Sequence, residues 1–300
     1  MSFVDKSIAL CEKIGCKYST EAFLKDYTSF KIGGKADLMV FPENETMISE
    51  LLRFADENSV SVFILGKGSN LLVSDDGIRG IVINTCKLDE IKLIDDTTIY
   101  CQSGASLLKV CRFALENSLS GLEFAFGIPG TAGGAAYMNA GAYGGEMKDV
   151  LVSCEHIDSK GNKGMYSDSE LNLGYRHSVY DNSGLFITSL TLKLKKGDKN
   201  EIKSRMDELM FKRKDKQPLD YPSAGSTFKR PEGYFAGALI EQCGLKGYKI
   251  GDAGVSEKHA GFVINHGNAT AENVIDLINH CRDTVFKNTG VTLEPEVKII

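Results

Sequence analysis

The sequence predicts an α+β fold, with a mixed α/β fold as the close alternative, and three observations carry this prediction. Segments whose apolar residues recur at helical spacing are interspersed with short apolar or alternating runs typical of strands. These segments do not follow the even strand–helix cadence of a barrel. The chain has 300 residues, 42% hydrophobic and 25% charged, which is the composition of a globular protein. That length suggests two domains, or one large domain with an addition.

The first half of the chain contains two predicted helices and three predicted strands. Apolar residues recur every three or four positions over 46–58 and over 107–114, which predicts the helices. The apolar run 62–65 stops at a glycine-rich turn, as a buried strand does. Residues 80–84 and 98–102 are the other two strand candidates.

The second half begins with a strand and a charged helix. Leucines alternate with polar residues over 190–195, which predicts a half-buried strand. The charged stretch 198–217 predicts an exposed helix and is the best candidate for a domain boundary. Helices follow at 235–242 and 274–285, with a strand at 261–265 between them.

Charge and hydropathy exclude several classes of partner. Lysine and arginine total 35 against 40 acidic residues, a formal net charge of −5. This balance argues against nucleic-acid or anionic-membrane binding but allows a local cationic pocket. No apolar run approaches the ~20 residues that span a bilayer, and residues 1–18 lack a secretory apolar core. Nothing in the sequence identifies a protein partner.

The eight cysteines are scattered and contain no Cys-x-x-Cys pair. Such isolated cysteines are typical of reduced, partly buried thiols in a cytosol. A zinc site would need paired ligands at short spacing, so no metal is expected.

Three glycine-rich stretches, 29–36, 65–72 and 121–145, stand out. Dense glycine marks positive φ or close backbone approach, and consecutive N–H groups can form an anion-binding nest. Tight turns without a ligand are the alternative for any one stretch, but three together favour a phosphate-bearing cofactor. The order Gly66-Lys67-Gly68-Ser69 is not a P-loop, and Leu71 stands where a dinucleotide-binding Gly-x-Gly-x-x-Gly would need glycine.

Ordered motifs along the chain resemble the flavin-dependent UDP-N-acetylenolpyruvoylglucosamine reductases, also called UDP-N-acetylmuramate dehydrogenases. Gly-Lys-Gly-Ser-Asn at 66–70 and the 127–145 segment are similar to the FAD-binding part of that family. Gly-Tyr-Arg-His-Ser, Ala-Gly-Ser-Thr-Phe-Lys and Leu-Glu-Pro-Glu-Val follow at 174–178, 224–229 and 293–297. The remaining matching segments are 244–248 and 255–260. The resemblance covers nearly the whole chain.

The resemblance implies a cytoplasmic step of peptidoglycan precursor synthesis. NADPH as co-substrate would reduce a non-covalently bound FAD, which in turn would reduce the enolpyruvyl group of a UDP-sugar to a lactyl ether. Arg176 would hold the substrate carboxylate, because a guanidinium binds it bidentately. Glu296 would hydrogen-bond the carboxyl group, and Ser226 would donate the proton. Taken singly, such an arginine is more often part of a surface ion pair, such a serine is usually a turn residue or helix cap, and Glu296 is consistent with an exposed strand residue. Only their joint occurrence with the flavin motifs favours a catalytic role.

The resemblance also assigns binding residues. The residues implied for FAD are Gly66, Lys67, Gly68, Ser69, Asn70, Gly127, Ile128, Pro129, Gly130, Thr131, Gly133, Gly134, Ala140, Gly141, Ala142 and Arg213. The residues implied for the UDP-sugar are Tyr175, Lys216, Lys229, Arg230 and His259. His259 is equally consistent with a buried structural histidine.

Two departures place the chain with the second, shorter type of this family. The first type carries an extra loop with a substrate-clamping tyrosine after the Arg176 motif, and only about ten residues separate Arg176 from the strand at Leu185 here. Arg230 also stands where the first type has asparagine.

The fold implied by the resemblance is a two-lobed FAD-binding domain of the vanillyl-alcohol-oxidase-like type with a C-terminal α+β substrate domain. The expected divisions are an N-terminal helical segment at 1–20, an FAD-binding domain at 21–197 with lobes at about 21–85 and 86–197, a substrate domain at 198–290 and a final strand at 291–300 that returns to the active site. Two other functions remain open. One is a flavin oxidase of the same superfamily, and the other is a non-catalytic nucleotide-binding module.

Overall fold

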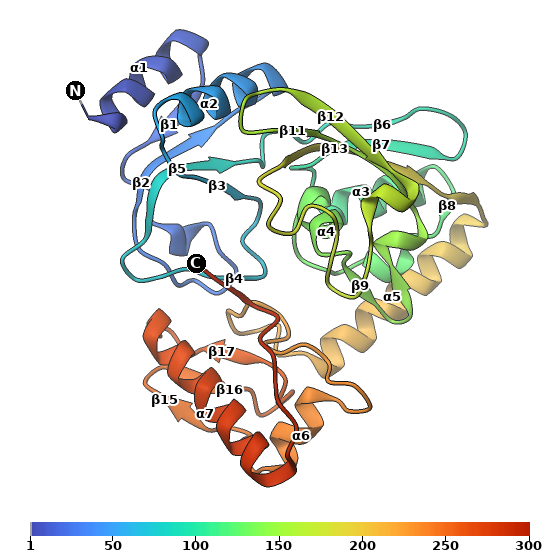
Figure 1. Cartoon of the computed structure of the whole chain (residues 1–300). Helices are drawn as coiled ribbons and strands as arrows, with labels where there is room; N and C mark the ends of the chain where they lie inside the picture. The colour runs from blue at the N-terminus through green and yellow to red at the C-terminus, as the bar shows by residue number, and fades with distance from the viewer. Residues whose placement is uncertain (1) are drawn as a thin grey trace. The chain divides into compact units, whose positions relative to one another are not determined.

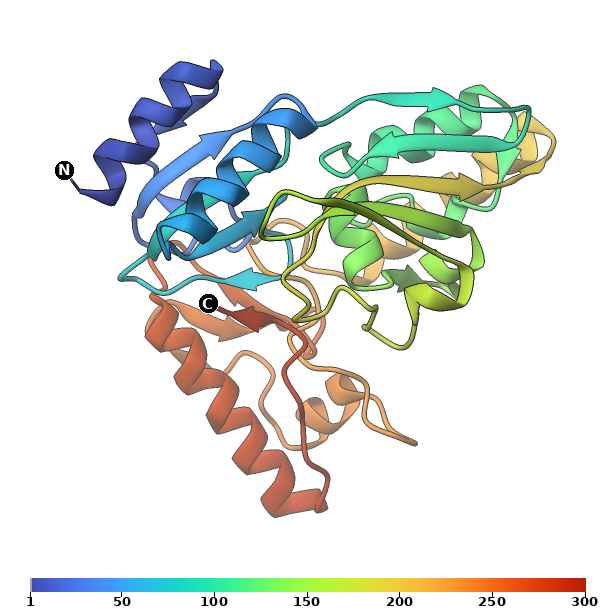
Figure 2. The same cartoon turned by 45° about the horizontal axis from the view of Figure 1, so that its top comes forward.

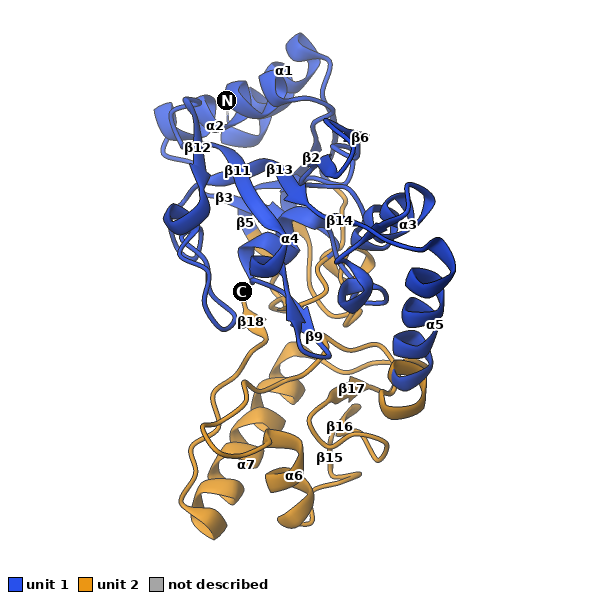
Figure 3. Ribbon diagram, turned by 90° about the vertical axis from the view of Figure 1, so that its right-hand side faces the viewer, with its two compact units in different colours: residues 1–20, 37–67, 79–212 blue, residues 21–36, 68–78, 213–300 orange. Residues whose placement is uncertain are grey.

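The computed structural model describes residues 2–300, and these form two compact units. Unit 1 contains residues 1–20, 37–67 and 79–212, and unit 2 contains residues 21–36, 68–78 and 213–300 (Figure 3). Helices and strands are mixed throughout (Figure 1), so the predicted α+β class is confirmed. The two units are built from interleaved stretches of the chain. The expected division of the chain into contiguous functional segments stays a prediction.

One part of unit 1 is a four-stranded sheet with two helices. The strand order is β1-β2-β5-β3, with bounds β1 (Lys17–Ser19), β2 (Ala36–Phe41), β3 (Val62–Leu65) and β5 (Ile78–Asn84). Helices α1 (Phe3–Ile14) and α2 (Glu45–Glu57) lie side by side (Figure 2). The helix predicted over 46–58 is confirmed as α2, since Asn44 caps its first turn and its apolar face is buried.

A five-stranded antiparallel sheet forms the other part of unit 1. Its order is β12-β11-β13-β7-β6, with bounds β6 (Ile91–Leu93), β7 (Thr98–Gln102), β11 (Leu151–Ile157), β12 (Lys163–Ser167) and β13 (Phe186–Lys193). Two helices, α3 (Leu107–Glu116) and α4 (Ala132–Tyr137), contribute to its hydrophobic core. The smaller strands are β8 (Leu119–Ser120), β9 (Gly141–Ala142), β10 (Gly145–Glu146) and β14 (Lys195–Lys196).

The charged helix predicted over 198–217 is α5 (Lys199–Lys216). It is not exposed on every side, because Ile202, Met206 and Leu209 form a narrow buried stripe. These three positions are three or four residues apart, which is the spacing of one helix face.

Unit 2 is built from three separate stretches of chain. A small antiparallel sheet, β15 (Lys249–Ile250), β16 (Ala253–Val255) and β17 (Val263–Asn265), contacts α7 (Ala271–Thr289). Helix α6 (Ala236–Gln242) packs on α7, and β4 (Leu71–Leu72) pairs in parallel with β18 (Lys298–Ile299). The buried core of the unit includes Phe30 and Ile32 from the first stretch and Leu72 from the second.

Candidate functional site

The glycine-rich loop after β3 meets the segment before α4. A Cβ atom on Gly66 would lie 2.7 Å from Oγ1 of Thr131, so the Thr131 side chain packs directly against the backbone of Gly66. Next to this contact, Nζ of Lys67 donates a 2.9 Å hydrogen bond to Oγ of Ser106. The Thr131 hydroxyl also accepts the N–H of Gly134 and so caps α4. Part of the predicted cofactor set is therefore brought together within unit 1.

A second close approach in the same region involves Gly133 and Ser103. The Gly133 N–H donates to the Ser103 carbonyl at 2.8 Å, and a Cβ on Gly133 would lie 2.7 Å from Cβ of Ser103. Ser103 is 2% exposed, and its hydroxyl has no hydrogen-bond partner among residues 2–300. A buried hydroxyl without a partner is costly, so the arrangement fits a ligand that brings a polar group to this surface. Sequence reasoning missed Ser103, since one serine beside glycine carries no distinctive pattern.

The residues after α4 form a tight hairpin. Strands β9 and β10 pair through Gly145 with Ala142, and both turn residues, Tyr143 and Gly144, have positive φ. Two consecutive positive φ values are characteristic of the type I′ turn that matches the twist of paired strands. Predicted cofactor residues Gly141 and Ala142 make up β9.

Arg176 lies in a strained two-residue turn. Gly174 and His177 pair across the turn through N–H···O bonds of 3.0 and 3.2 Å, and Arg176 has φ +54°. A left-handed conformation costs a non-glycine residue about 1–2 kcal/mol, and such strain clusters at functional sites. Nη2 of Arg176 lies 3.5 Å from the Gly141 carbonyl, and its guanidinium lies 5.1 Å from the centre of the Tyr175 ring. The turn therefore places the Arg176 guanidinium beside β9.

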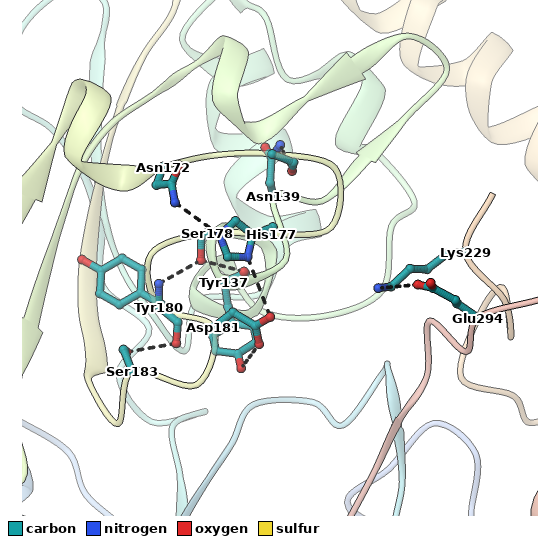
Figure 4. Close-up of polar contacts among 11 residues, drawn as sticks. Tyr137, Asn139, Asn172, His177, Ser178, Tyr180, Asp181, Ser183, Lys229 and Glu294 are labelled. Carbon is teal, nitrogen blue, oxygen red and sulfur yellow. Dashed lines mark hydrogen bonds and ion pairs between the residues drawn. The ribbon is translucent and has the colours of Figure 1, made fainter. Parts of the chain in front are cut away.

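Asn139 joins this turn to the hairpin and was not predicted as a functional residue. Its Nδ2 donates at 2.8 Å both to the Gly174 carbonyl and to Oε2 of Glu146, while its Oδ1 accepts the Lys148 N–H at 2.9 Å. Asn139 is fully buried and has φ +41°. The sequence pattern that could have indicated Asn139 is an asparagine within a glycine-rich segment, because asparagine tolerates the left-handed backbone conformation that glycine also adopts. Figure 4 shows Asn139 near the loop that carries His177.

The chain that follows Arg176 is held by a polar network (Figure 4). Tyr137 donates to Oδ1 of Asp181 at 2.8 Å, and Ser178 donates to the Tyr137 carbonyl at 2.8 Å. Burial and then the Asp181 carboxylate raise the pKa of Tyr137 to about 12. The Asp181 carboxylate also lies 3.8 Å from Nδ1 of His177. These contacts fix the chain on the C-terminal side of the Arg176 turn.

In unit 2, the segments that carry Ser226 and Glu296 lie side by side. The Glu296 N–H donates to the Thr227 carbonyl at 2.8 Å, and Asn70 donates from Nδ2 to the Glu296 carbonyl at 3.0 Å. Thr227 in turn donates its N–H to Gly261. Ser226 itself is exposed, and Glu296 is half-buried. Asn70 and Glu296, two predicted site residues from distant parts of the chain, thus share one hydrogen-bond network with Thr227, the neighbour of Ser226.

The predicted substrate residues of unit 2 are more dispersed. Lys229 pairs with Glu294 at 3.3 Å (Figure 4), and the Arg230 guanidinium lies 4.0 Å from the centre of the Phe235 ring. Burial lowers the pKa of His259, whose Nδ1 accepts the Gly261 N–H at 3.1 Å. A neutral imidazole is therefore favoured there. Lys216 is exposed.

The other predicted FAD residues lie on both units by chain position. Gly127, Ile128, Pro129, Gly130 and Ala140 belong to unit 1, and Gly68, Ser69 and Arg213 belong to unit 2. Within residues 2–300, no three His, Cys, Asp or Glu side chains group as a metal site requires. None of the helices in this part of the chain combines the length and apolarity needed to cross a bilayer.

Comparison with known proteins defines the class and then the family. Residues 36–163 match the family described as FAD binding domain, which makes the chain an FAD-binding oxidoreductase. Residues 217–300 match the family described as the C-terminal domain of UDP-N-acetylenolpyruvoylglucosamine reductase. The chain belongs to the UDP-N-acetylenolpyruvoylglucosamine reductase family, as its relatives and a solved structure also show.

Two curated reductases and one crystal structure illustrate this similarity. The Clostridium beijerinckii reductase is 50% identical over 279 residues, covering 93% of this chain and 91% of that protein. The Clostridium tetani reductase is 50% identical over 292 residues, covering 97% and 95%. The crystal structure of the Thermus caldophilus reductase superposes with a TM-score of 0.81 at 35% identity, covering 95% of this chain and 98% of that one. The predicted family and the FAD-binding plus C-terminal-domain fold are confirmed.

Proposed function

We propose that this protein reduces the enolpyruvyl group of UDP-N-acetylglucosamine enolpyruvate to UDP-N-acetylmuramate, with NADPH as co-substrate, in the cytoplasm. The observation that carries the proposal is the hydrogen-bonded pairing of the Ser226 segment with Glu296, joined through Thr227. This pairing offers a hydroxyl and a carboxyl from adjacent backbone, which suits a reaction that must protonate a carbon beside a carboxylate.

The glycine-rich residues of unit 1 would hold FAD by their backbone. Gly66 and Gly133 leave no room for a side chain, and the Ser103 hydroxyl offers a buried polar partner. Bound FAD would supply hydride-transfer chemistry, which no amino-acid side chain provides. No histidine or cysteine occurs in 64–72 or 124–145, so a covalent flavin link there is not expected.

Each proposed catalytic residue has a separate task. Arg176 binds the substrate carboxylate through its planar fork and stays charged at any working pH. Glu296 hydrogen-bonds the same carboxyl group as negative charge develops, which requires the Glu296 carboxyl group to carry a proton or a water to bridge the two groups. Ser226 holds a proton on Oγ and delivers it to the carbon next to that carboxylate. Tyr175, Lys216, Lys229, Arg230 and His259 are the proposed contacts to the UDP-sugar.

The test separates the two halves of the reaction. Ser226→Ala, loaded with FAD, should be reduced by NADPH at nearly the wild-type rate, while reoxidation by the enolpyruvyl UDP-sugar should fall by about 10²–10³ or more. Ser226→Cys retains a proton donor and should recover part of the second rate. Anaerobic stopped-flow absorbance of the flavin measures both steps. Equal loss of both half-reactions in Ser226→Ala would contradict the assigned role.

A further inference from the structure

The C-terminal end of α1 brings two cysteines together. Gly15 takes a left-handed conformation, with φ +71°, and its N–H donates to the Glu12 carbonyl at 3.3 Å. The Cys16 N–H donates to the Cys11 carbonyl at 2.8 Å. These two bonds define a Schellman motif, in which the residues at the positions of Cys11 and Cys16 normally make a side-chain contact. In this helix both contacting side chains are thiols.

The backbone separation of the pair suits a disulfide. Because one 2.8 Å hydrogen bond joins the backbone of Cys16 to that of Cys11, their Cα atoms lie about 5–6 Å apart, within the disulfide range. Cys11 is 0% and Cys16 4% exposed, so the contact is shielded from bulk water. Both are free thiols in this structure.

The two thiols differ in acidity because one donates a hydrogen bond to the other. The hydrogen bond from Cys11, followed by one from the Phe41 backbone, lowers the pKa of the Cys16 thiol against the opposing effect of burial. The same bond raises the pKa of Cys11. Cys16 is therefore the better thiolate, and Cys11 is placed to act second.

A small hollow lies next to the pair. It measures about 540 Å³ and is lined by Cys11, Cys16, Tyr18 and Phe41, with Lys17 and Lys87 among the other lining residues. Glu12 also lines it and counters part of this positive charge. The hollow gives a small reagent a place to reach Cys16, and all of these residues belong to unit 1.

We propose that Cys11 and Cys16 form a reversible dithiol–disulfide site that reacts with a low-molecular-weight disulfide. The Cys16 thiolate attacks one sulfur of the reagent, its S–S bond breaks, and the first thiol leaves. Cys11 then loses its proton and attacks the sulfur of Cys16 in the mixed disulfide, which releases the second thiol. Two electrons pass from the cysteine pair to the reagent, giving one protein disulfide and two small thiols. A dithiol reductant reverses the reaction.

The experiment uses the full-length FAD-loaded protein and oxidised glutathione. Samples are quenched with acid at intervals, denatured and alkylated with N-ethylmaleimide, and then analysed by intact mass and peptide mapping. The reduced protein should take one adduct for each of its eight cysteines, and the treated protein should take two fewer. A cross-linked Cys11–Cys16 peptide should appear, and dithiothreitol should remove it.

Single-cysteine variants and an internal control test the order in which the two cysteines react. Cys11→Ser should stop at one glutathione on Cys16, whereas Cys16→Ser should leave Cys11 unmodified. Cys101 is an internal control, since burial raises the pKa of its thiol to about 12, and it should react at least about tenfold more slowly. Wild-type protein in which Cys11 and Cys16 both remain alkylatable while glutathione accumulates on the more exposed Cys86 would overturn the proposal, as would a disulfide that omits Cys11 or Cys16.

Discussion

Replacing Asn139 by alanine removes three hydrogen bonds at the junction of the Arg176 turn and the β9–β10 hairpin. Each bond contributes about 1 kcal/mol net, and the Lys148 N–H loses its side-chain acceptor. Alanine must also keep a φ of +41°, which costs about 1 kcal/mol more than asparagine or glycine. The variant should therefore lose about 3–4 kcal/mol of stability.

Glycine and aspartate at the same position separate these contributions. Asn139→Gly removes the hydrogen bonds but accepts the positive φ, so it should be about 1 kcal/mol milder than Asn139→Ala. Asn139→Asp keeps the acceptor for Lys148 but loses both donated bonds and faces Glu146 with a second carboxylate. Its loss of stability should grow as the pH rises above the ordinary range of carboxyl groups.

Thermal and denaturant unfolding of the three variants provide the stability assay. At about 2–4 °C per kcal/mol, Asn139→Ala should lower Tm by about 6–16 °C. A loosened Arg176 turn should also raise KM for the enolpyruvyl UDP-sugar and lower kcat, while flavin reduction by NADPH stays near wild type. A Tm within 2 °C of wild type for Asn139→Ala, or an equal loss in both half-reactions, would refute this reasoning.

Three further predictions test the site and the fold. Arg176→Lys keeps the charge but loses the bidentate fork, so oxidation of the reduced flavin by substrate should slow by about 10²–10³, measured by stopped-flow against wild type. Gly66→Ala puts a Cβ 2.7 Å from Oγ1 of Thr131 and should weaken FAD binding by at least about tenfold in fluorescence titration, whereas Gly134→Ala, with a 3.4 Å contact, should be milder. Burial lowers the pKa of His156 below 6.5, so as the pH falls this histidine becomes protonated in the unfolded state before it does in the folded state. The stability of the protein should therefore fall as the pH drops below about 6.5. His156→Gln should flatten that fall in denaturant midpoints, and an unchanged slope would exclude His156 as its source.

Local patterns predicted the regular elements well where one face is buried. The helix predicted over 46–58 is α2 at Glu45–Glu57, because its apolar stripe and the Asn44 cap both act within a few residues. The strand predicted over 190–195 runs instead over Phe186–Lys193 as β13. Its first five residues are all buried, so they show no alternation that would mark the true start.

The geometry of the site depends on contacts that no local pattern contains. Asn139 binds the carbonyl of Gly174, which lies 35 positions further along the chain, and the preference of asparagine for left-handed backbone does not indicate that partner. The pairing of Thr227 with Glu296 likewise arises only when the last stretch of chain packs into unit 2. The motifs therefore predicted which residue types matter, whereas the folded chain supplies their neighbours.

The interleaved composition of unit 2 constrains how the protein can be divided. The C-terminal family match begins at residue 217, yet Phe30, Ile32 and Leu72 supply side chains to the same core. A fragment cut at that match would leave an apolar face uncovered and would deprive β18 of its partner β4. An isolated unit 2 would therefore require its three stretches to be joined by linkers in one polypeptide, and during synthesis this core can close only after its last member, Val297, has been made.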